Sequence, residues 1–135
     1  GHLYRSVSED GGKSWFEAQP TPIWGHPAHI IPVRGVAGAR PGEALLCAYA
    51  HRRPPYGVRA VLSRDGGATW DVENEKLIRD DSAGVVGYPT SVQLEDDSIF
   101  TGYELGKPAG EGERPHSYVA GSRYTLDYVG ALGKR

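Results

Sequence analysis

An eight-residue sequence, Ser-x-Asp-Gly-Gly-x-Ser/Thr-Trp, occurs twice in this chain, and it limits the possible folds more than any other feature. The copies occupy residues 8–15 and 63–70 and agree at six of eight positions if serine and threonine count as equivalent. Their aspartates, Asp10 and Asp65, lie 55 positions apart. That offset is close to the roughly 40 to 50 residues of a four-stranded repeat unit. The repeat therefore predicts successive units of one kind.

Each octapeptide has the composition of a tight turn between strands. Glycines allow the positive φ that such turns need, Asp and Ser side chains can bond turn amides, and the tryptophan can pack beneath the turn. We therefore expect structural roles for Ser8, Asp10, Gly12, Trp15, Ser63, Asp65, Gly67 and Trp70.

Composition indicates an all-β protein, because 19 glycines and 10 prolines separate short apolar runs. Alternating and β-branched patterns predict nine strands, grouped by the repeat as two, four and three. The expected strands are 3–7, 14–17, 29–33, 44–50, 58–63, 69–72, 90–94, 98–103 and 117–126. The segments 19–22, 53–56 and 106–115 are expected to be loops.

A net charge of −2 predicts no general affinity for nucleic acid or anionic membranes. No apolar run approaches the roughly 20 residues that span a bilayer, so a soluble protein is expected. The single Cys47 lies in an apolar run and is expected to be buried, which leaves the compartment open. Because the sequence has no methionine, we expect that residues have been removed before Gly1.

Both octapeptides resemble the Asp boxes of the sialidase superfamily, whose members are six-bladed β-propellers with the boxes on the rim opposite the active site. The resemblance is to the C-terminal part of that family. It implies a partial propeller of about two to three blades of four-stranded antiparallel sheets, as one segment over residues 1–135. The expected parts are a blade remnant at 1–20, a full blade at 28–73 and a three-stranded last blade at 88–128. Asp boxes also occur in non-catalytic propellers, so they imply architecture only.

The segment from Gly87 to Glu104 resembles the sialidase segment that leads from a catalytic tyrosine, through a strand and an Asp-Gly turn, to Tyr-Glu. By this resemblance Tyr88 would be the nucleophile, and the turn Asp96-Asp97-Ser98 lacks the family's glycine. Sialic acid carries a carboxylate on its anomeric carbon, so a neutral phenol avoids the repulsion that a carboxylate nucleophile would meet.

The resemblance also implies that Arg59 belongs to the family's carboxylate-binding arginines, where a guanidinium offers two parallel hydrogen bonds. Glu104 would hold an active-site arginine in place. Three residues of the preceding loop, Arg52, Arg53 and Tyr56, could line the rim of the pocket.

The family's site also needs two further arginines, an activating glutamate and an acid/base aspartate, which normally come from earlier blades. We therefore expect a segment of a sialidase-like exo-glycosidase that is inactive alone, with a sialoside or other glycan as ligand. Two alternatives stay open: a non-catalytic module for glycan binding or structure, and a glycosidase for another sugar. No cofactor or metal is expected, since His26 and His29 lack a third ligand at short spacing. Open sheet edges predict self-association or dependence on the rest of a longer propeller.

Overall fold

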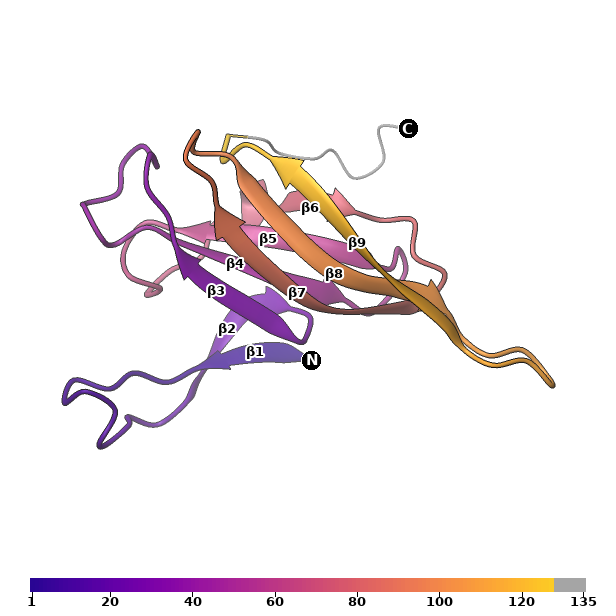
Figure 1. Cartoon of the computed structure of the whole chain (residues 1–135). Coiled ribbons are helices and arrows are strands. Elements are labelled where there is room, and N and C mark those ends of the chain that lie inside the picture. The colour runs from indigo at the N-terminus through magenta and orange to yellow at the C-terminus, as the bar shows by residue number, and fades with distance from the viewer. Residues whose placement is uncertain (128–135) are drawn as a thin grey trace.

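The computed structural model describes residues 1–127 and is built of β-strands (Figure 1). Tyr128, the expected last residue of the third strand group, lies outside the described residues. A single 3₁₀ turn, Val72–Asn74, is the one helical element in the described part. The strands are β1 (His2–Arg5), β2 (Gln19–Trp24), β3 (Ala28–Pro32), β4 (Leu45–His51), β5 (Gly57–Ser63), β6 (Lys76–Arg79), β7 (Val85–Gln93), β8 (Ile99–Lys107) and β9 (His116–Tyr124).

The strands form three antiparallel sheets, each built from consecutive strands. Sheet A is β1-β2, sheet B is β3-β4-β5-β6, and sheet C is β7-β8-β9. The all-β class and the grouping of strands into two, four and three are therefore confirmed. None of the described sheets closes on itself. Across residues 1–127 there is also no helix of the length and apolarity needed to cross a membrane.

Two of the expected strands, 14–17 and 69–72, were wrong, and each begins within the last two residues of an octapeptide. The segment 14–17 belongs to the turn, and the strand that pairs with β1 is Gln19–Trp24, which contains Pro20 and Pro22. Prolines are compatible with this strand because it is at a sheet edge, where alternate amides need no partner. Likewise, the fourth strand of sheet B is Lys76–Arg79 instead of 69–72.

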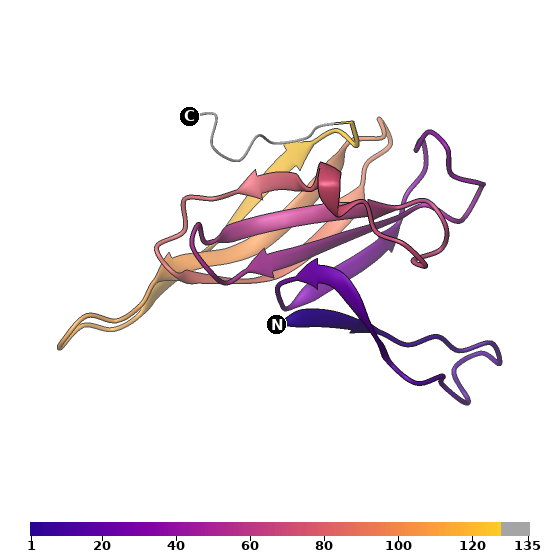
Figure 2. The ribbon, with the colours of Figure 1, turned by 180° about the vertical axis from the view of Figure 1, so that it is seen from behind.

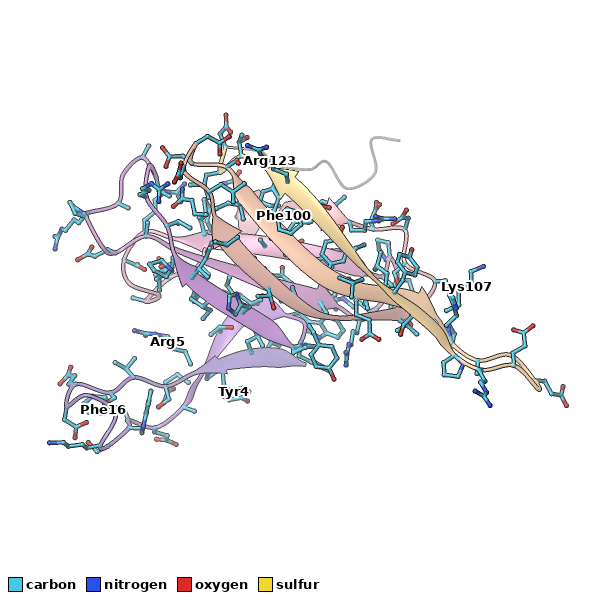
Figure 3. The ribbon with its side chains drawn as sticks, viewed as in Figure 1. Tyr4, Arg5, Phe16, Phe100, Lys107 and Arg123 are labelled. Carbon is cyan, nitrogen blue, oxygen red and sulfur yellow. The ribbon has the colours of Figure 1, made fainter. Side chains whose placement is uncertain are left out.

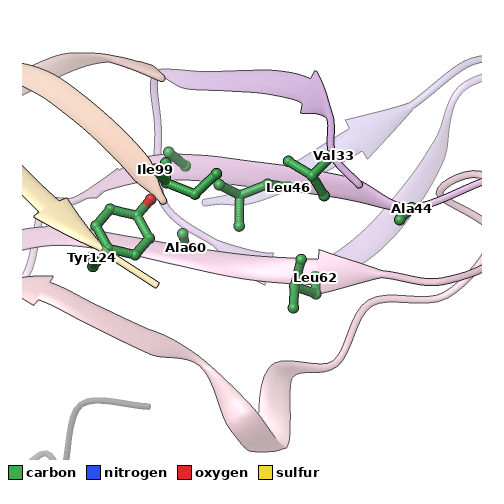
Figure 4. Packing of buried hydrophobic residues seen from close by; sticks show 8 residues of the cluster. Val33, Ala44, Leu46, Ala60, Leu62, Ile99 and Tyr124 are labelled. Atoms are coloured by element: carbon green, nitrogen blue, oxygen red, sulfur yellow. The ribbon is translucent and has the colours of Figure 1, made fainter. Parts of the chain in front are cut away.

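The sheets stack face to face, so sheet B is buried on both sides (Figures 1 and 2). Alternate residues of β4 and β5 point to opposite faces. Cys47, Tyr49 and Val61 pack with Ile23 of sheet A. Leu46 and Ala60 pack on the other face with Ile99 and Tyr124 of sheet C, as Figure 4 shows. Burial on both faces explains why residues 44–50 are continuously apolar.

The sequence repeat is also a structural repeat. Strands β1 and β5 begin at His2 and Gly57, and strands β2 and β6 end at Trp24 and Arg79. Both pairs of positions differ by the same 55 residues that separate the octapeptides. Strands β1 and β2 are therefore the counterparts of β5 and β6, and each octapeptide joins the last two strands of its sheet.

Candidate functional site

The two octapeptides form the same hydrogen-bonded turn. In the first, the Ser8 hydroxyl donates to Asp10 Oδ1 at 2.8 Å and accepts from the Gly12 amide at 2.8 Å, while the Ser14 hydroxyl donates to Asp10 Oδ2 at 2.6 Å. In the second, the bonds from Ser63 to Asp65, from the Gly67 amide to Ser63 and from Thr69 to Asp65 measure 2.8, 2.8 and 2.6 Å. The predicted turn chemistry is thus confirmed in both copies.

These bonds stabilise the ionised aspartates. Hydrogen bonds from the Ser14 side chain and amide lower the pKa of Asp10 to about 2, and the bonds from Thr69 do the same for Asp65. All of these donors are uncharged hydroxyl and amide groups of the same turn, so the aspartates serve to stabilise the turn. We assign them no part in chemistry.

The tryptophans of the two copies differ in their surroundings. Each ring lies against the second glycine of its turn, within 3.9 Å of a Cβ placed on Gly12 and 3.5 Å of one placed on Gly67. Trp70 is 9% exposed because sheet A packs on it, through Leu3 and Ile23 among others. Trp15 is 64% exposed. The same sequence therefore produces a core residue in one copy and a surface residue in the other.

The candidate site residues lie at the end of the sheets opposite the octapeptides. The octapeptides follow the carboxyl ends of β1 and β5, whereas Arg52, Arg53 and Tyr56 lie in the loop from β4 to β5 at the other end. Tyr88 is near the start of β7, and Glu104 lies opposite Gly87 on β8, so both belong to this end as well. We call this group of five residues the loop-end cluster.

Tyr88 sits in an irregular part of its strand. Between Gly87 and Thr90, strand β7 holds one residue more than the facing part of β8, which is a β-bulge. Tyr88 has a φ of 51°, a left-handed conformation that a bulky residue adopts at a cost of about 1 to 3 kcal/mol. The residue is also 69% exposed. Bulges and strained residues concentrate near functional sites, because they direct a side chain where a regular strand cannot.

Arg52 and Glu104 lie against the glycine that precedes Tyr88. The Nη2 of Arg52 and the Oε2 of Glu104 are 2.9 and 3.6 Å from where a Cβ on Gly87 would be. The Nε of Arg52 donates to the Val86 carbonyl at 2.9 Å, which anchors the guanidinium. A side chain at position 87 would displace Arg52. The guanidinium can lie this close to the backbone because residue 87 is a glycine.

Arg59 is not brought together with Tyr88. It is 7% exposed and its Nη1 forms a 2.7 Å ion pair with Oε2 of Glu75. Its side chain is on the same face of β5 as Val61, which is the face toward sheet A, whereas Tyr88 belongs to sheet C. The expectation that Arg59 reaches the ligand carboxylate therefore has no geometric support, and among the expected arginines it is Arg52 that lies beside Gly87.

A further group of contacts at this end was missed by sequence reasoning. The Arg53 guanidinium lies 4.1 Å from the centre of the Trp24 ring, and its Nε donates to Nε2 of His51 at 3.2 Å. Because Nε2 accepts, the proton of His51 is on Nδ1, which donates to the Pro55 carbonyl at 3.1 Å. Burial, followed by the positive charge of Arg59, lowers the pKa of His51. The Trp24-Gly25-His26 segment gave no sequence signal for this contact.

His29, which forms a His-x-x-His pair with His26 in the sequence, has a structural partner. Nδ1 of His29 accepts the Ser91 amide at 3.1 Å, which joins sheets B and C. In the described part of the chain, no three His, Cys, Asp or Glu side chains are grouped to hold a metal ion.

No protein-family model matches the chain, and a comparison with curated proteins also finds no match. Among solved structures, the chain is similar to a protein of unknown function from Dyadobacter fermentans DSM 18053, with 28% sequence identity and a TM-score of 0.66. The similarity covers 87% of this chain and 29% of that one. The chain thus spans less than a third of the length of the structure that it matches.

Proposed function

We propose that this chain is part of a sialidase-like β-propeller and that its loop-end cluster contributes to a binding site for an acidic sugar. The observation that carries the proposal is Tyr88, an exposed tyrosine held in a left-handed conformation by a β-bulge. Nothing in the packing of the core requires this strain, since the ring is mostly outside the core. A role in contacting a ligand explains it.

The propeller is supported by the way the sheets repeat. Antiparallel sheets of consecutive strands stack face to face, and an octapeptide joins the last two strands of sheets A and B. In a propeller such sheets are the blades, arranged radially around a channel. Sheet B would be a complete blade, and sheets A and C would be parts of two others. The turns of the octapeptides would then lie on the face away from the sugar site.

Arg52 would supply the positive charge for the sugar carboxylate. Its Nε is occupied by the Val86 carbonyl, which leaves the terminal nitrogens beside Gly87 to meet an anion. A guanidinium suits this role because it can donate two parallel hydrogen bonds to one carboxylate. Glu104 lies beside it and would limit its movement, and the Tyr88 phenol would contact the ligand next to the carboxylate.

Binding without hydrolysis is the expected behaviour of the chain alone. The family's mechanism needs further arginines, a glutamate and an aspartate from earlier blades, and the buried Arg59 does not replace them. The same tyrosine could therefore belong to a catalytic site in a larger assembly. In this chain alone, Tyr88 would still contact the sugar, and the sugar would bind weakly.

Titration with an α-methyl sialoside, followed by NMR amide shifts, tests the proposal. We expect saturable shifts at residues 86–89 and 104, lost in Tyr88→Ala and reduced about 10-fold or more in affinity in Arg52→Gln, as expected for a lost charge-assisted bond. Tyr4→Ala is the matched control, because Tyr4 is 68% exposed but lies on β1. Equal shifts in the wild type and in Tyr88→Ala would reject the proposal.

Two additional measurements separate the alternatives. Equal affinity for a neutral galactoside would favour a site for another sugar over one for an acidic sugar. Turnover of a fluorogenic sialoside well above that of Tyr88→Phe would contradict the expectation of an inactive chain.

A non-catalytic, structural role is the second candidate, and the burial of Arg59 with Glu75 favours it.

Self-association would accompany either role, because apolar side chains are exposed on both outer sheets. Val92, Phe100 and Val119 of sheet C are 51%, 42% and 85% exposed, and Tyr4 of sheet A is 68% exposed. We expect light scattering to report a mass above that of the monomer; a monodisperse monomer at high concentration would contradict this.

A further inference from the structure

The loop from β4 to β5, residues 52–56, is attached to two different sheets. On one side, the Nε of Arg52 donates to the Val86 carbonyl of sheet C at 2.9 Å. On the other side, the Arg53 guanidinium lies 4.1 Å from the centre of the Trp24 ring of sheet A. Two prolines of the loop have no amide hydrogen to donate. The two arginine side chains are therefore important attachments of the loop.

His51 determines how Arg53 is held. The Nε of Arg53 donates to Nε2 of His51 at 3.2 Å, and the His51 ring lies edge-on to Trp24 with ring centres 5.3 Å apart. A guanidinium has only donors, so this bond exists only while Nε2 carries no proton. The proton of the ring is on Nδ1, which donates to the Pro55 carbonyl at 3.1 Å. His51 is therefore neutral in this arrangement.

Protonation of His51 would remove the acceptor for Arg53. In an imidazolium both ring nitrogens are donors, so Nε2 would present a proton and a positive charge to the guanidinium. His51 is 3% exposed, so water cannot readily replace the lost bond. Burial, followed by the positive charge of Arg59, lowers the pKa of His51 below its ordinary value of 6.5. The contribution of the neutral ring is therefore present above pH 6.5 and is lost as pH falls through the lowered pKa.

The charged groups around the His51 ring oppose its protonation. Among the described residues, the charges that act on the ring are those of Arg53 in the loop and Arg59 on β5, and both are positive. Glu75 pairs with Arg59 at 2.7 Å and offsets part of that charge. A proton on His51 would thus add a third positive charge beside two guanidiniums.

Two other groups of titratable side chains lie at this end of the sheets. His2 is the partner of Trp24 across sheet A, and it is exposed. The connection from β8 to β9 carries charged residues from Lys107 onward and extends away from the sheets, as Figure 3 shows. Of these groups, His2 is the one placed to affect Trp24 independently of His51.

We propose that His51 is a pH-dependent latch for residues 52–56. The neutral ring holds Arg53 against Trp24, whereas the protonated ring repels the guanidinium and releases it from both contacts. The sheet A side of the loop would then detach. Arg52 belongs to the same loop, so its placement would loosen and an acidic sugar would bind more weakly at acidic pH. That last consequence alone rests on the function proposed above.

NMR of the whole chain between about pH 7.5 and about pH 5 tests the latch. At the upper end, the ring nitrogen shifts of His51 should show the Nδ1–H tautomer. On acidification, the His51 ring and the indole N–H of Trp24 should titrate with one shared midpoint below pH 6.5. The Nε–H of Arg53 should then exchange with water about 10-fold faster, relative to a free arginine side chain at the same pH.

Two variants isolate the contribution of His51. His51→Gln does not titrate but keeps a side-chain oxygen that can accept from Arg53, so the shared midpoint and the faster exchange should both be lost. Glu75 is unchanged in this variant, so any pH dependence that comes from Glu75 persists in it. His2→Gln is the matched control, because His2 is the strand partner of Trp24, and the shared titration should remain.

An Nε2–H tautomer of His51 at about pH 7.5 overturns the proposal. This measurement uses the wild type, so it does not depend on the folding of a variant. A Trp24 titration that persists unchanged in His51→Gln overturns the proposal as well.

The sialoside titration tests the link from the latch to the sugar site. We expect affinity to fall about 5-fold or more on acidification in the wild type and to stay constant in His51→Gln. An equal fall in both overturns this link. A sialoside that binds at neither pH rejects the function proposed above, whereas the His51 tautomer and the Trp24 shifts still decide the latch.

Discussion

Replacing the two corresponding tryptophans by alanine should have very different effects on stability. Trp15 and Trp70 occupy the same position of the octapeptide and lie against equivalent glycines, yet they are 64% and 9% exposed. A tryptophan side chain has roughly 250 Å² of surface, so this difference in exposure corresponds to about 140 Å². At about 25 cal/mol per Å², the difference in the free energy of unfolding is about 3.5 kcal/mol.

We therefore expect Trp70→Ala to cost about 4 kcal/mol, within the usual range for large aromatic side chains in a core. Trp15→Ala should cost about 1 kcal/mol or less, as surface substitutions generally do. Urea unfolding followed by far-ultraviolet circular dichroism measures both, provided that the slope with urea stays the same.

The two tryptophans can still be compared if Trp70→Ala is too unstable to fold. Trp70→Phe and Trp15→Phe then form the pair, with the same order expected and smaller values. If the two alanine variants differ by less than about 1 kcal/mol, the packing of sheet A on Trp70 does not stabilise the chain, and our account of the interface between sheets A and B is wrong.

Three further predictions concern single positions. Tyr88→Gly should leave stability unchanged or raise it by about 1 kcal/mol in thermal unfolding, because relief of the left-handed strain outweighs the added chain entropy; a clear loss would contradict strain at this bulge. Asp97→Gly should raise stability by up to about 1 kcal/mol, because Asp97 has a φ of 65° and its ion pair with Arg34 is exposed and weak; no gain would mean that the pair matters more. The pKa values of Asp10 and Asp65 are lowered to about 2, so the stability that their turn hydrogen bonds contribute is present above the ordinary pKa of 3.8 and is lost as pH falls toward 2. The NMR shifts of the amides four residues after each aspartate should therefore change between pH 4 and 2. A titration midpoint near pH 4 would exclude these hydrogen bonds.

Local chemistry made much of this structure predictable. The glycines, serines and aspartates of the octapeptides interact within eight residues, so their turn geometry follows from the residue types and their order alone. Asp97 lies in the turn where the sialidase segment has a glycine. The three-residue loop after Leu94 still requires a positive φ at this position, which Asp97 adopts. The number of strands and their grouping followed from the spacing of such turns.

The strand limits after each octapeptide were less predictable. Pairing of Gln19–Trp24 with β1 overrides the turn preference of Pro20 and Pro22, since an edge strand tolerates their missing amide donors. The environment of Arg59 could not be predicted from the sequence either. Its sequence context is that of a strand-end cation, but it is buried and paired with Glu75, which lies 16 residues further along the chain.

The sequence by itself determined the turns, the strand grouping and the 55-residue repeat, because each depends on contacts between near neighbours in the chain. Only the tertiary structure decided which of two corresponding tryptophans is buried and which arginine lies beside Gly87. Those features depend on which sheet packs on which face, and such contacts join residues whose separation along the chain carries no local signal. Tyr88 combines both, since its place in a tyrosine-proline pair is local, whereas its bulge and exposure follow from pairing with β8.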